Sequence, residues 1–594
     1  MKRLSYAVGV PVTVAGLAAA LALTGVGFVP VQAAAAAPVD CPKPLPTVEA
    51  VDGMAATGFT VEKGVEPAPF SAEVLGRIDD AIAPGVDMIM ARVSSPAITR
   101  AGGVWAGMSG SPVYAPDGRL IGAMAYVLST NTQVAGITPA ETMFPLLTTA
   151  APAKAAGARA GASRVVVPPA AARRLAARGV GVQAGQGAFD RLDLPVSLSS
   201  AGSASQRKLA ERFLGAIPDV KVVTGGSKAP TTAARPSVIR AGGNFAAALS
   251  YGAVTAAAIG TTTFVCDGRA VAFGHPFLYA GSKTFSAHSA SALFVQPSKA
   301  KIPFKVANVG GVVGTVDRDV TAGIAATLGA GPRTVLVTST LGRVGRRAVT
   351  DTSRVPTEDF TSSAVGFHIY DRALAALGGE GRGSAALTVK ITGVRANGKP
   401  FTHTVSDRYA GTDPDPDFGF AFSMASRIVY EVDALSTMQE LEDVRITAVD
   451  VKGTFEPTVR QFRVTKVTVK KGSRYVPFEQ AAVSPGSTVK VRVALASFKN
   501  LMGSRTVDLT LKAPRSMPRE GVSLVFDAGY EFDTLYLTAP SYDVLLKESQ
   551  TTGRGSSVRL SLQLLNQRGE AVPGRAPLAS AKASLPAAVR VHRL

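Results

Sequence analysis

Gly107-Met108-Ser109-Gly110-Ser111-Pro112 precedes the apolar pair Val113-Tyr114 in this chain of 594 residues. Glycines on both sides of Ser109 permit backbone angles that a side chain would forbid, so consecutive N–H groups can point at one oxyanion. Ser109 is therefore predicted to be a nucleophile, with the amides of Gly107 and Ser109 as its oxyanion hole. Ser111 is not predicted, because its own amide would not complete that hole. The alternative is a plain Gly/Ser turn before a strand.

A serine at its free pKa needs a neighbouring base, and imidazole is the usual one. The chain contains five histidines: His275, His288, His368, His403 and His592. Only His275 lies in a Gly-His-Pro loop after an apolar run, so it is predicted to be the base for Ser109. The alternative is a turn histidine. No motif supports a metal site on the other histidines, and no cofactor or metal is expected.

Two separated blocks of this sequence resemble the SpoIVB-type serine peptidases, a family named for the protease of the fourth stage of bacterial sporulation. The first block is GMSGSPVY at 107–114, which continues as DGRLIGA at 117–123. The second is FGHPF at 273–277, followed by VGT at 313–315. In the sporulation enzyme the histidine block comes first. The reversed order here resembles a secreted bacterial branch of the family.

This resemblance implies a trypsin-like β-barrel peptidase domain that is assembled from the two blocks. It also implies Ser109 as the nucleophile, His275 as its base and a protein or peptide as the substrate. With the weaker matches around them, the first block runs from Gly53 to Met143 and the second from Ala258 to Thr315, so the resemblance spans roughly the first 300 residues of the mature chain.

The third catalytic residue departs from the family pattern. The sporulation enzyme has an aspartate shortly before its nucleophile, but residues 94–99 here read SSPAIT and contain no carboxylate. Asp87 is predicted to orient His275, with Asp267, Ser95 or a backbone carbonyl as alternatives. A triad that lacks its acid commonly loses several orders of magnitude in rate. A slow, self-processing or narrowly specific endopeptidase is therefore expected.

Composition and patterning predict a mainly β chain of several domains. Hydrophobic residues make up 46% of the chain and charged residues 18%, which is enough to fill cores, and Val489, Val491, Val493 and Leu495 alternate as in half-buried antiparallel strands. Two short helices are expected, at 170–178 and 205–214. The predicted organisation is a signal peptide at 1–33, the serine half of the peptidase domain at 34–150, an insert or linker at 151–235, the histidine half at 236–345, a β-rich connecting region at 346–450 and a C-terminal β-sandwich module at 451–594.

The N-terminus predicts export. Lys2 and Arg3 precede an apolar run that ends near Val31 in small residues, as in a secretory signal peptide. An uncleaved membrane anchor is the alternative, because the run is long enough to span a bilayer. The two cysteines, Cys41 and Cys266, are predicted to form an intramolecular disulfide that ties the two halves of the peptidase domain together. Free thiols or pairing between chains are the alternatives.

The formal net charge of +20 raises the question of an anionic partner. Lys and Arg are scattered, without an aromatic-interleaved basic stripe, so nucleic acid is not predicted. In an exported protein, attraction to anionic cell-wall polymers or a membrane surface is the more specific interpretation, and a generally basic solvated surface is the simpler one. Two functions remain: a secreted serine endopeptidase, or a non-catalytic extracellular cell-wall- or protein-binding β-module protein that retains a peptidase-like fold.

Overall fold

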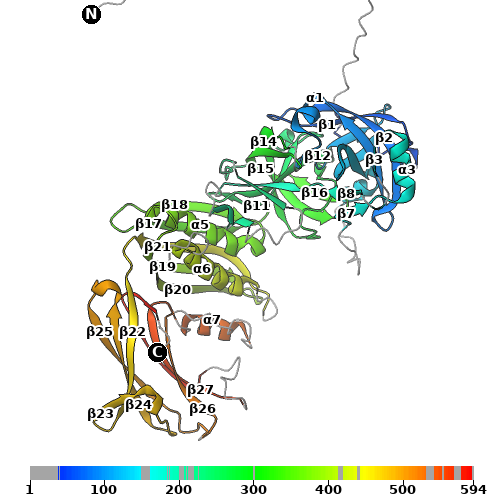
Figure 1. Cartoon of the computed structure of the whole chain (residues 1–594). Coiled ribbons are helices and arrows are strands. Elements are labelled where there is room, and N and C mark those ends of the chain that lie inside the picture. Colours follow the sequence, from blue (N-terminus) through cyan, green and yellow to red (C-terminus); the bar gives the residue numbers. More distant parts are fainter. Residues whose placement is uncertain are drawn as a thin grey trace, which may run out of the picture. The chain divides into compact units, whose positions relative to one another are not determined.

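The first half of the chain forms two six-stranded antiparallel β-barrels in the computed structural model, drawn in blue to green in Figure 1. This is the trypsin-like double-barrel arrangement that the sequence predicts, within a chain that is mainly β. The structure describes residues 38, 40–148, 161–182, 185, 187–199, 206–208, 210–211, 220–224, 226–298, 302–412, 419–437, 442–518, 520–529, 541–551, 554–566 and 577–590.

The first barrel carries the predicted serine block. Its strands follow one another around the barrel as β4 (Pro112–Tyr114), β1 (Ala55–Thr60), β2 (Ala68–Ala83), β3 (Val86–Ser94), β6 (Asn131–Pro139) and β5 (Leu120–Leu128), and β4 pairs with β5 to close it. Every residue of β5 is buried. Two short helices accompany the barrel, α1 (Pro96–Ala101) after β3 and α2 (Ala140–Met143) after β6.

The second barrel carries the predicted histidine block. Its strands follow one another as β12 (Ala256–Cys266), β13 (Arg269–Ala272), β16 (Gly323–Leu328), β15 (Phe304–Val320), β14 (Phe285–Gln296) and β11 (Asn244–Gly252), and β11 pairs with β12 to close it. Phe245, Phe273 and Phe285 are fully buried in its core. The serine and histidine blocks therefore belong to different barrels, and any site that joins them lies where the barrels meet.

The segment 151–235, which the sequence presents as an insert or linker, contributes strands to both sheets. β7 (Arg164–Val166) and β8 (Ala188–Arg191) extend the first sheet, and β9 (Leu194–Leu198) and β10 (Val220–Thr224) extend the second. The helix expected at 170–178 is α3 (Pro169–Ala177). Of the helix expected at 205–214, residues 206–208 and 210–211 are described, and they are helical.

The connecting region contains two long helices that the sequence analysis did not predict. Its strands are ordered β18 (Val349–Val355), β17 (Val335–Arg343), β21 (Arg445–Glu456), β19 (Gly383–Val394) and β20 (Pro400–Gly411), and β18 also pairs with β11 of the second barrel. Figure 1 shows α5 (Thr361–Leu377) and α6 (Phe420–Thr437) lying together against this sheet.

The C-terminal region contains two sheets around one hydrophobic core, as expected for a β-sandwich. One sheet contains β22 (Gln461–Lys471), β23 (Arg474–Pro477), β24 (Thr488–Ser497), β25 (Ser504–Lys512) and β29 (Ala588–Arg590). The other contains β26 (Val522–Ala528), β27 (Ser557–Leu564) and β28 (Ala579–Ser584), and the helix α7 (Tyr542–Thr551) lies between β26 and β27 in sequence. Val489, Val491, Val493 and Leu495 are all buried in the shared core, as their alternation predicts.

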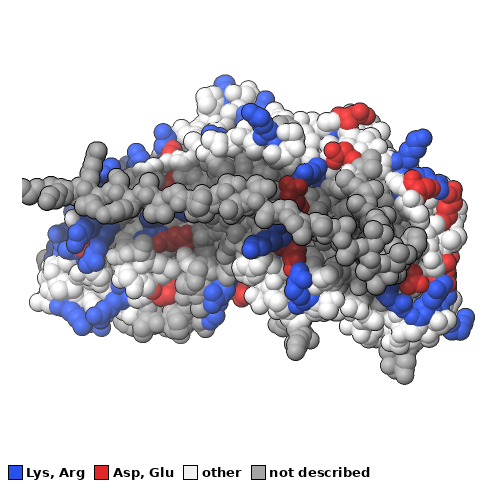
Figure 2. All heavy atoms as spheres, turned by 90° about the horizontal axis from the view of Figure 1, so that it is seen from above, with Lys and Arg blue, Asp and Glu red and all other residues white. Residues whose placement is uncertain are grey.

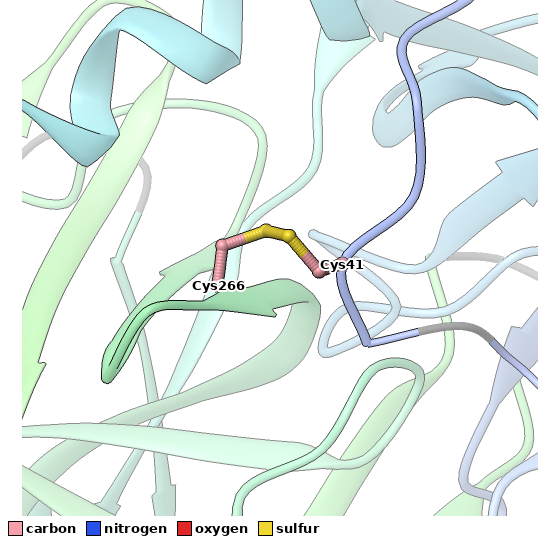
Figure 3. The surroundings of a disulfide bond; sticks show 2 residues. All are labelled: Cys41 and Cys266. Carbon is pink, nitrogen blue, oxygen red and sulfur yellow. A yellow bond between two sulfur atoms is a disulfide. The ribbon is translucent and has the colours of Figure 1, made fainter.

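The predicted disulfide is present between Cys41 and Cys266, whose Cα atoms are 4.9 Å apart (Figure 3). Cys41 precedes the first barrel, and Cys266 ends β12 of the second. The predicted signal peptide at 1–33 lies outside the described residues. None of the helices in the described part of the chain combines the length and the apolar character needed to cross a bilayer.

Candidate active site

The loop between α1 and β4 holds Ser109 in a conformation that only glycines permit. Gly107 has φ +101° and Gly110 has φ +92°, both in the left-handed region. A Cβ atom at Gly110 would lie 2.0 Å from the carbonyl oxygen of Thr261, so a side chain is also excluded for lack of space. The two glycines that identify the motif in the sequence are therefore required by its geometry.

Two amides of this loop have no acceptor among the described residues, and they are the two that the sequence predicts. The N–H groups of Ala106, Met108, Gly110 and Ser111 all donate to backbone carbonyls. The N–H groups of Gly107 and Ser109 donate to none of the described residues, although both residues are buried. Buried N–H groups are rarely left unpaired, and a pair beside a serine is what an oxyanion hole requires.

Strand β12 of the second barrel binds the carbonyl side of the same loop. The amide of Thr261 donates to the Ser109 carbonyl at 2.8 Å, and its hydroxyl donates to the Gly107 carbonyl at 3.1 Å. The hydroxyl of Thr263 donates to the Gly110 carbonyl at 2.9 Å. The second barrel thus fixes the peptide groups of a loop that belongs to the first.

His275 follows β13 in a strained turn. Phe273 has φ +71°, a left-handed conformation that is unfavourable for a bulky residue, and Gly274 has φ +68°. The Thr138 hydroxyl, from β6 of the first barrel, donates to the Gly274 carbonyl at 2.6 Å. A Cβ at Gly274 would lie 2.9 Å from the Cβ of Ala123, so the turn packs tightly against β5.

The structure brings Ser109 and His275 into hydrogen-bond contact. His275 Nε2 lies 2.9 Å from Ser109 Oγ, and His275 Nδ1 lies 2.8 Å from the carbonyl oxygen of Pro276. Because a carbonyl only accepts, Nδ1 of the neutral ring carries the proton, and Nε2 is left to accept the proton of the Ser109 hydroxyl. This is the tautomer that a general base needs.

Burial keeps the His275 ring neutral. Desolvation is the main cause that lowers the pKa of His275, to about 3, and the positive charge of Arg191 adds to it. The bond to the Pro276 carbonyl acts in the opposite direction. Ser109 is fully buried and His275 is 1% exposed, so the pair is closed off from solvent in this conformation.

Asp87 does not orient His275, which corrects the prediction from sequence. Asp87 lies at the start of β3, where its carboxylate accepts the Asp80 amide at 3.0 Å and lies 3.6 Å from Arg77 Nε. Both ring nitrogens of His275 are already bonded to other groups. Asp87 was chosen only because it lies close to the serine block in sequence. Its carboxylate instead binds groups of the hairpin between β2 and β3.

Of the alternatives for the group that orients His275, the structure shows the backbone carbonyl, which is that of Pro276. Ser95 accepts the Ile98 amide at 3.2 Å as the N-cap of α1. Asp267 is an exposed residue of the turn between β12 and β13. The dyad is therefore completed by a peptide group rather than by a carboxylate.

Ser111 and the other described histidines lie outside this arrangement. Ser111 Oγ has a long contact of 3.5 Å with Thr261 Oγ1. His288 bonds to the Gly310 carbonyl, His368 to two serine hydroxyls and His403 to the Ser549 hydroxyl. His592 is not among the described residues, and within those residues no group of three or more His, Cys, Asp or Glu could hold a metal ion.

Two further residues near the site were not found from the sequence. Lys305 is 1% exposed, its Nζ donates to Asn244 Oδ1 at 2.9 Å, and its Cβ fills the space beside Gly107. Burial lowers the pKa of Lys305 to about 7. Asp319 lies on β15, and its carboxylate is bonded to the turn that follows His275. Neither residue belongs to a motif, because the partners of each are distant in sequence: the Asn244 side chain for Lys305 and backbone amides of the turn for Asp319.

No family model, no curated protein and no solved structure matches this chain.

Proposed function

We propose that the protein is a secreted serine endopeptidase of narrow or self-processing specificity. The observation that carries this proposal is the 2.9 Å contact between Ser109 Oγ and His275 Nε2, beside the amides of Gly107 and Ser109, which donate to no described residue. The resemblance of its two sequence blocks to SpoIVB-type peptidases supports the same activity. As in trypsin-like peptidases, the serine and the histidine come from different barrels and meet between them.

In this proposal Ser109 Oγ attacks the carbonyl carbon of a peptide bond while His275 Nε2 takes its proton. The amides of Gly107 and Ser109 stabilise the oxyanion, and His275 then protonates the leaving amine. Water attacks the acyl-enzyme in the second half of the reaction. The Pro276 carbonyl holds Nδ1–H throughout. A neutral carbonyl stabilises an imidazolium less than a carboxylate does, so a slow enzyme is expected.

The burial of Ser109 and His275 favours narrow specificity. Because Ser109 is fully buried, a peptide bond can reach its Oγ only if the residues that cover Ser109 move. A substrate that displaces them specifically, or a segment of the same chain, would meet this requirement better than an arbitrary extended peptide.

The same burial is the observation that favours the second candidate, a non-catalytic extracellular protein that retains the fold. In that case the β-sandwich of residues 461–590 would provide the binding surface. The two candidates differ in whether Ser109 is reactive, which a chemical label measures directly.

Export and an anionic partner belong to the proposal as well. A disulfide between Cys41 and Cys266 suits an oxidising compartment. Figure 2 shows Lys and Arg spread over the visible face with acidic residues among them. This distribution suits weak attraction to anionic cell-wall polymers or a membrane surface, and we do not propose nucleic acid as a partner.

Labelling of the purified oxidised protein with a fluorophosphonate tests the activity. We expect Ser109 to be labelled, and we expect Ser109→Ala and His275→Ala to lose labelling to a similar extent, with the double variant no worse, because the residues act as one unit. Ser111→Ala is the matched control and should be labelled like the wild type. Loss of labelling in Ser111→Ala but not in Ser109→Ala would reject the assignment, and an unreactive wild type would favour the non-catalytic candidate.

A further inference from the structure

Asp319 binds the turn that follows His275 through three backbone amides. Its Oδ1 accepts the Phe277 amide at 2.8 Å, and its Oδ2 accepts the Leu278 amide at 2.7 Å and the Ala280 amide at 3.0 Å. The main chain of Asp319 exchanges two further hydrogen bonds with Gly281, at 2.8 and 2.9 Å. One residue of β15 therefore holds the turn at residues 277, 278, 280 and 281.

One of these bonds connects Asp319 to the dyad through a single peptide group. The Phe277 N–H and the Pro276 carbonyl are the two ends of the same planar peptide. The N–H end donates to Asp319, and the carbonyl end accepts Nδ1–H of His275. A continuous chain of hydrogen bonds thus runs from the Asp319 carboxylate through this peptide and His275 to Ser109.

The carboxylate acts on the carbonyl end of that peptide in two ways. It fixes the orientation of the peptide plane, and so the position of the acceptor for Nδ1–H. It also polarises the peptide, because each bond in such a chain strengthens the next, and more so at low dielectric. Both effects favour the Nδ1–H tautomer, in which Nε2 is free to accept from Ser109.

Asp319 is buried, so its bonds to the turn are not a solvent-exposed surface interaction. The residue is 0% exposed, and burial raises the pKa of its carboxyl, while the three amides and Arg191 oppose that rise. A buried carboxylate is costly, and it persists in a fold only when its partners compensate for the lost hydration. Here three amides of one turn provide that compensation.

We propose that Asp319 is the positioning residue of this site, supplying through the 276–277 peptide the orientation that a triad aspartate gives its histidine directly. The proposal rests on the proposed function, in which His275 is the base for Ser109. It also explains how the site does without a carboxylate beside the serine block. Asp319 touches no reacting atom, so its role is to orient His275.

Asp319→Asn tests this role because an amide cannot replace both carboxylate oxygens. If its NH₂ takes the place of Oδ1, the Phe277 amide loses its acceptor. If it takes the place of Oδ2, the Leu278 and Ala280 amides lose theirs. Asp317→Asn is the matched control: Asp317 is on the same strand, and its carboxylate pairs with Arg269 rather than with the turn.

Two readouts separate the outcomes. The first is the rate of fluorophosphonate labelling at Ser109, which should fall on the order of 10²-fold in Asp319→Asn, as for other small displacements of a catalytic group, and stay near the wild-type value in Asp317→Asn. The second is the Nδ1–H signal of His275 in the ¹⁵N-histidine NMR spectrum, assigned by its absence in His275→Gln. This signal should be lost or exchange faster in Asp319→Asn only.

The NMR readout does not depend on activity. If the wild type is not labelled but the Nδ1–H signal responds to Asp319→Asn, the proposed function is wrong and the positioning role stands. If both readouts are unchanged in a folded Asp319→Asn, the positioning role is wrong. Should this variant not fold, hydrogen exchange of the wild type decides: Nδ1–H must exchange together with the amides of 277–280, and independent exchange would overturn the proposal.

Discussion

His275 is kept neutral by its surroundings, and this has a measurable consequence for the pH dependence of the site. A base works only in its unprotonated form. Since burial first and Arg191 second lower the pKa of His275 to about 3, the base form persists far below the usual pKa of histidine, 6.5. Labelling of Ser109 should therefore stay constant as the pH falls from 8 to about 5, as long as the fold is intact.

Arg191→Gln should move the acid limb of this profile to higher pH, because it removes a positive charge that disfavours the imidazolium. Arg164→Gln, on the neighbouring strand β7 and paired with Asp190, is the control and should leave the limb in place. The measurement is the labelling rate from pH 8 down to about pH 2.5, so that it includes the acid limb, under conditions in which the fold is intact. A wild-type limb near 6.5 would contradict the prediction and would mean that His275 is solvated in solution.

Lys305 is a buried lysine, and its positive charge destabilises the fold because burial removes the charge from water. Burial lowers its pKa from 10.5 to about 7, so between these values the unfolded chain binds more protons than the native one. The contribution of Lys305 to stability therefore rises with pH across this window, by up to about 1.4 kcal/mol per pH unit, and is most unfavourable below pH 7.

Lys305→Met keeps an unbranched side chain, one atom shorter, and removes the charge. Below pH 7 the variant should be more stable than the wild type by about 1 to 3 kcal/mol, after the loss of the bond to Asn244, and this advantage should shrink as the pH rises toward 10. Urea unfolding at several pH values, followed by the fluorescence of Trp105, measures it, because Trp105 is the single tryptophan and is fully buried beside the serine loop. A difference that does not change with pH would show that Lys305 has the same pKa in the native and unfolded states and therefore stays charged when it is buried.

Among the structural elements, strand β12 decides how the serine loop is held. Thr263→Val replaces the hydroxyl that donates to the Gly110 carbonyl with a methyl group of similar size. We expect a loss of about 1 kcal/mol in the free energy of unfolding and slower labelling of Ser109, because the loop carbonyl loses its donor.

Thr262→Val is a matched control for Thr263→Val on the adjacent residue. The Thr262 hydroxyl is buried and has no hydrogen-bond partner within the described residues, so its loss should be neutral or stabilising. Urea unfolding and labelling rates of the two variants are compared side by side. Equal effects of the two substitutions would mean that the Thr263 bond does not hold the loop.

The same elements show what the sequence could and could not predict. The serine loop was predictable because its geometry needs glycines, and the alternating strands because one of their faces is buried. Helix α5 was missed because all residues from Thr361 to Tyr370 are buried, which leaves no polar face and no helical period in that part of the sequence. Asp319 was missed because its partners are backbone amides, which carry no residue identity.

At the scale of the whole molecule, the site exists only because two barrels are held together. Residues 40–45 contribute to this. The Asp40 carbonyl accepts the Val265 amide of β12 at 2.7 Å, and Leu45 and Lys43 bond to Leu120 of β5 at 2.7 and 2.8 Å. The disulfide from Cys41 to Cys266 fixes this segment to the barrel that carries His275.

Removal of the disulfide should therefore affect the site through the assembly of the barrels. The double variant Cys41→Ala/Cys266→Ala opens the loop that the disulfide closes between residues 225 positions apart. Chain entropy gives a loss of up to about 5 kcal/mol in the free energy of unfolding. We expect Trp105 fluorescence and Ser109 labelling to be lost together at a lower urea concentration than in the oxidised wild type, and the reduced wild type should behave like the variant. The β-sandwich of residues 461–590 has its own core, so its transition, followed by hydrogen exchange, should not move. Equal midpoints for the oxidised and reduced protein would show that the hydrogen bonds of residues 40–45 and the packing between the barrels hold the site without the disulfide.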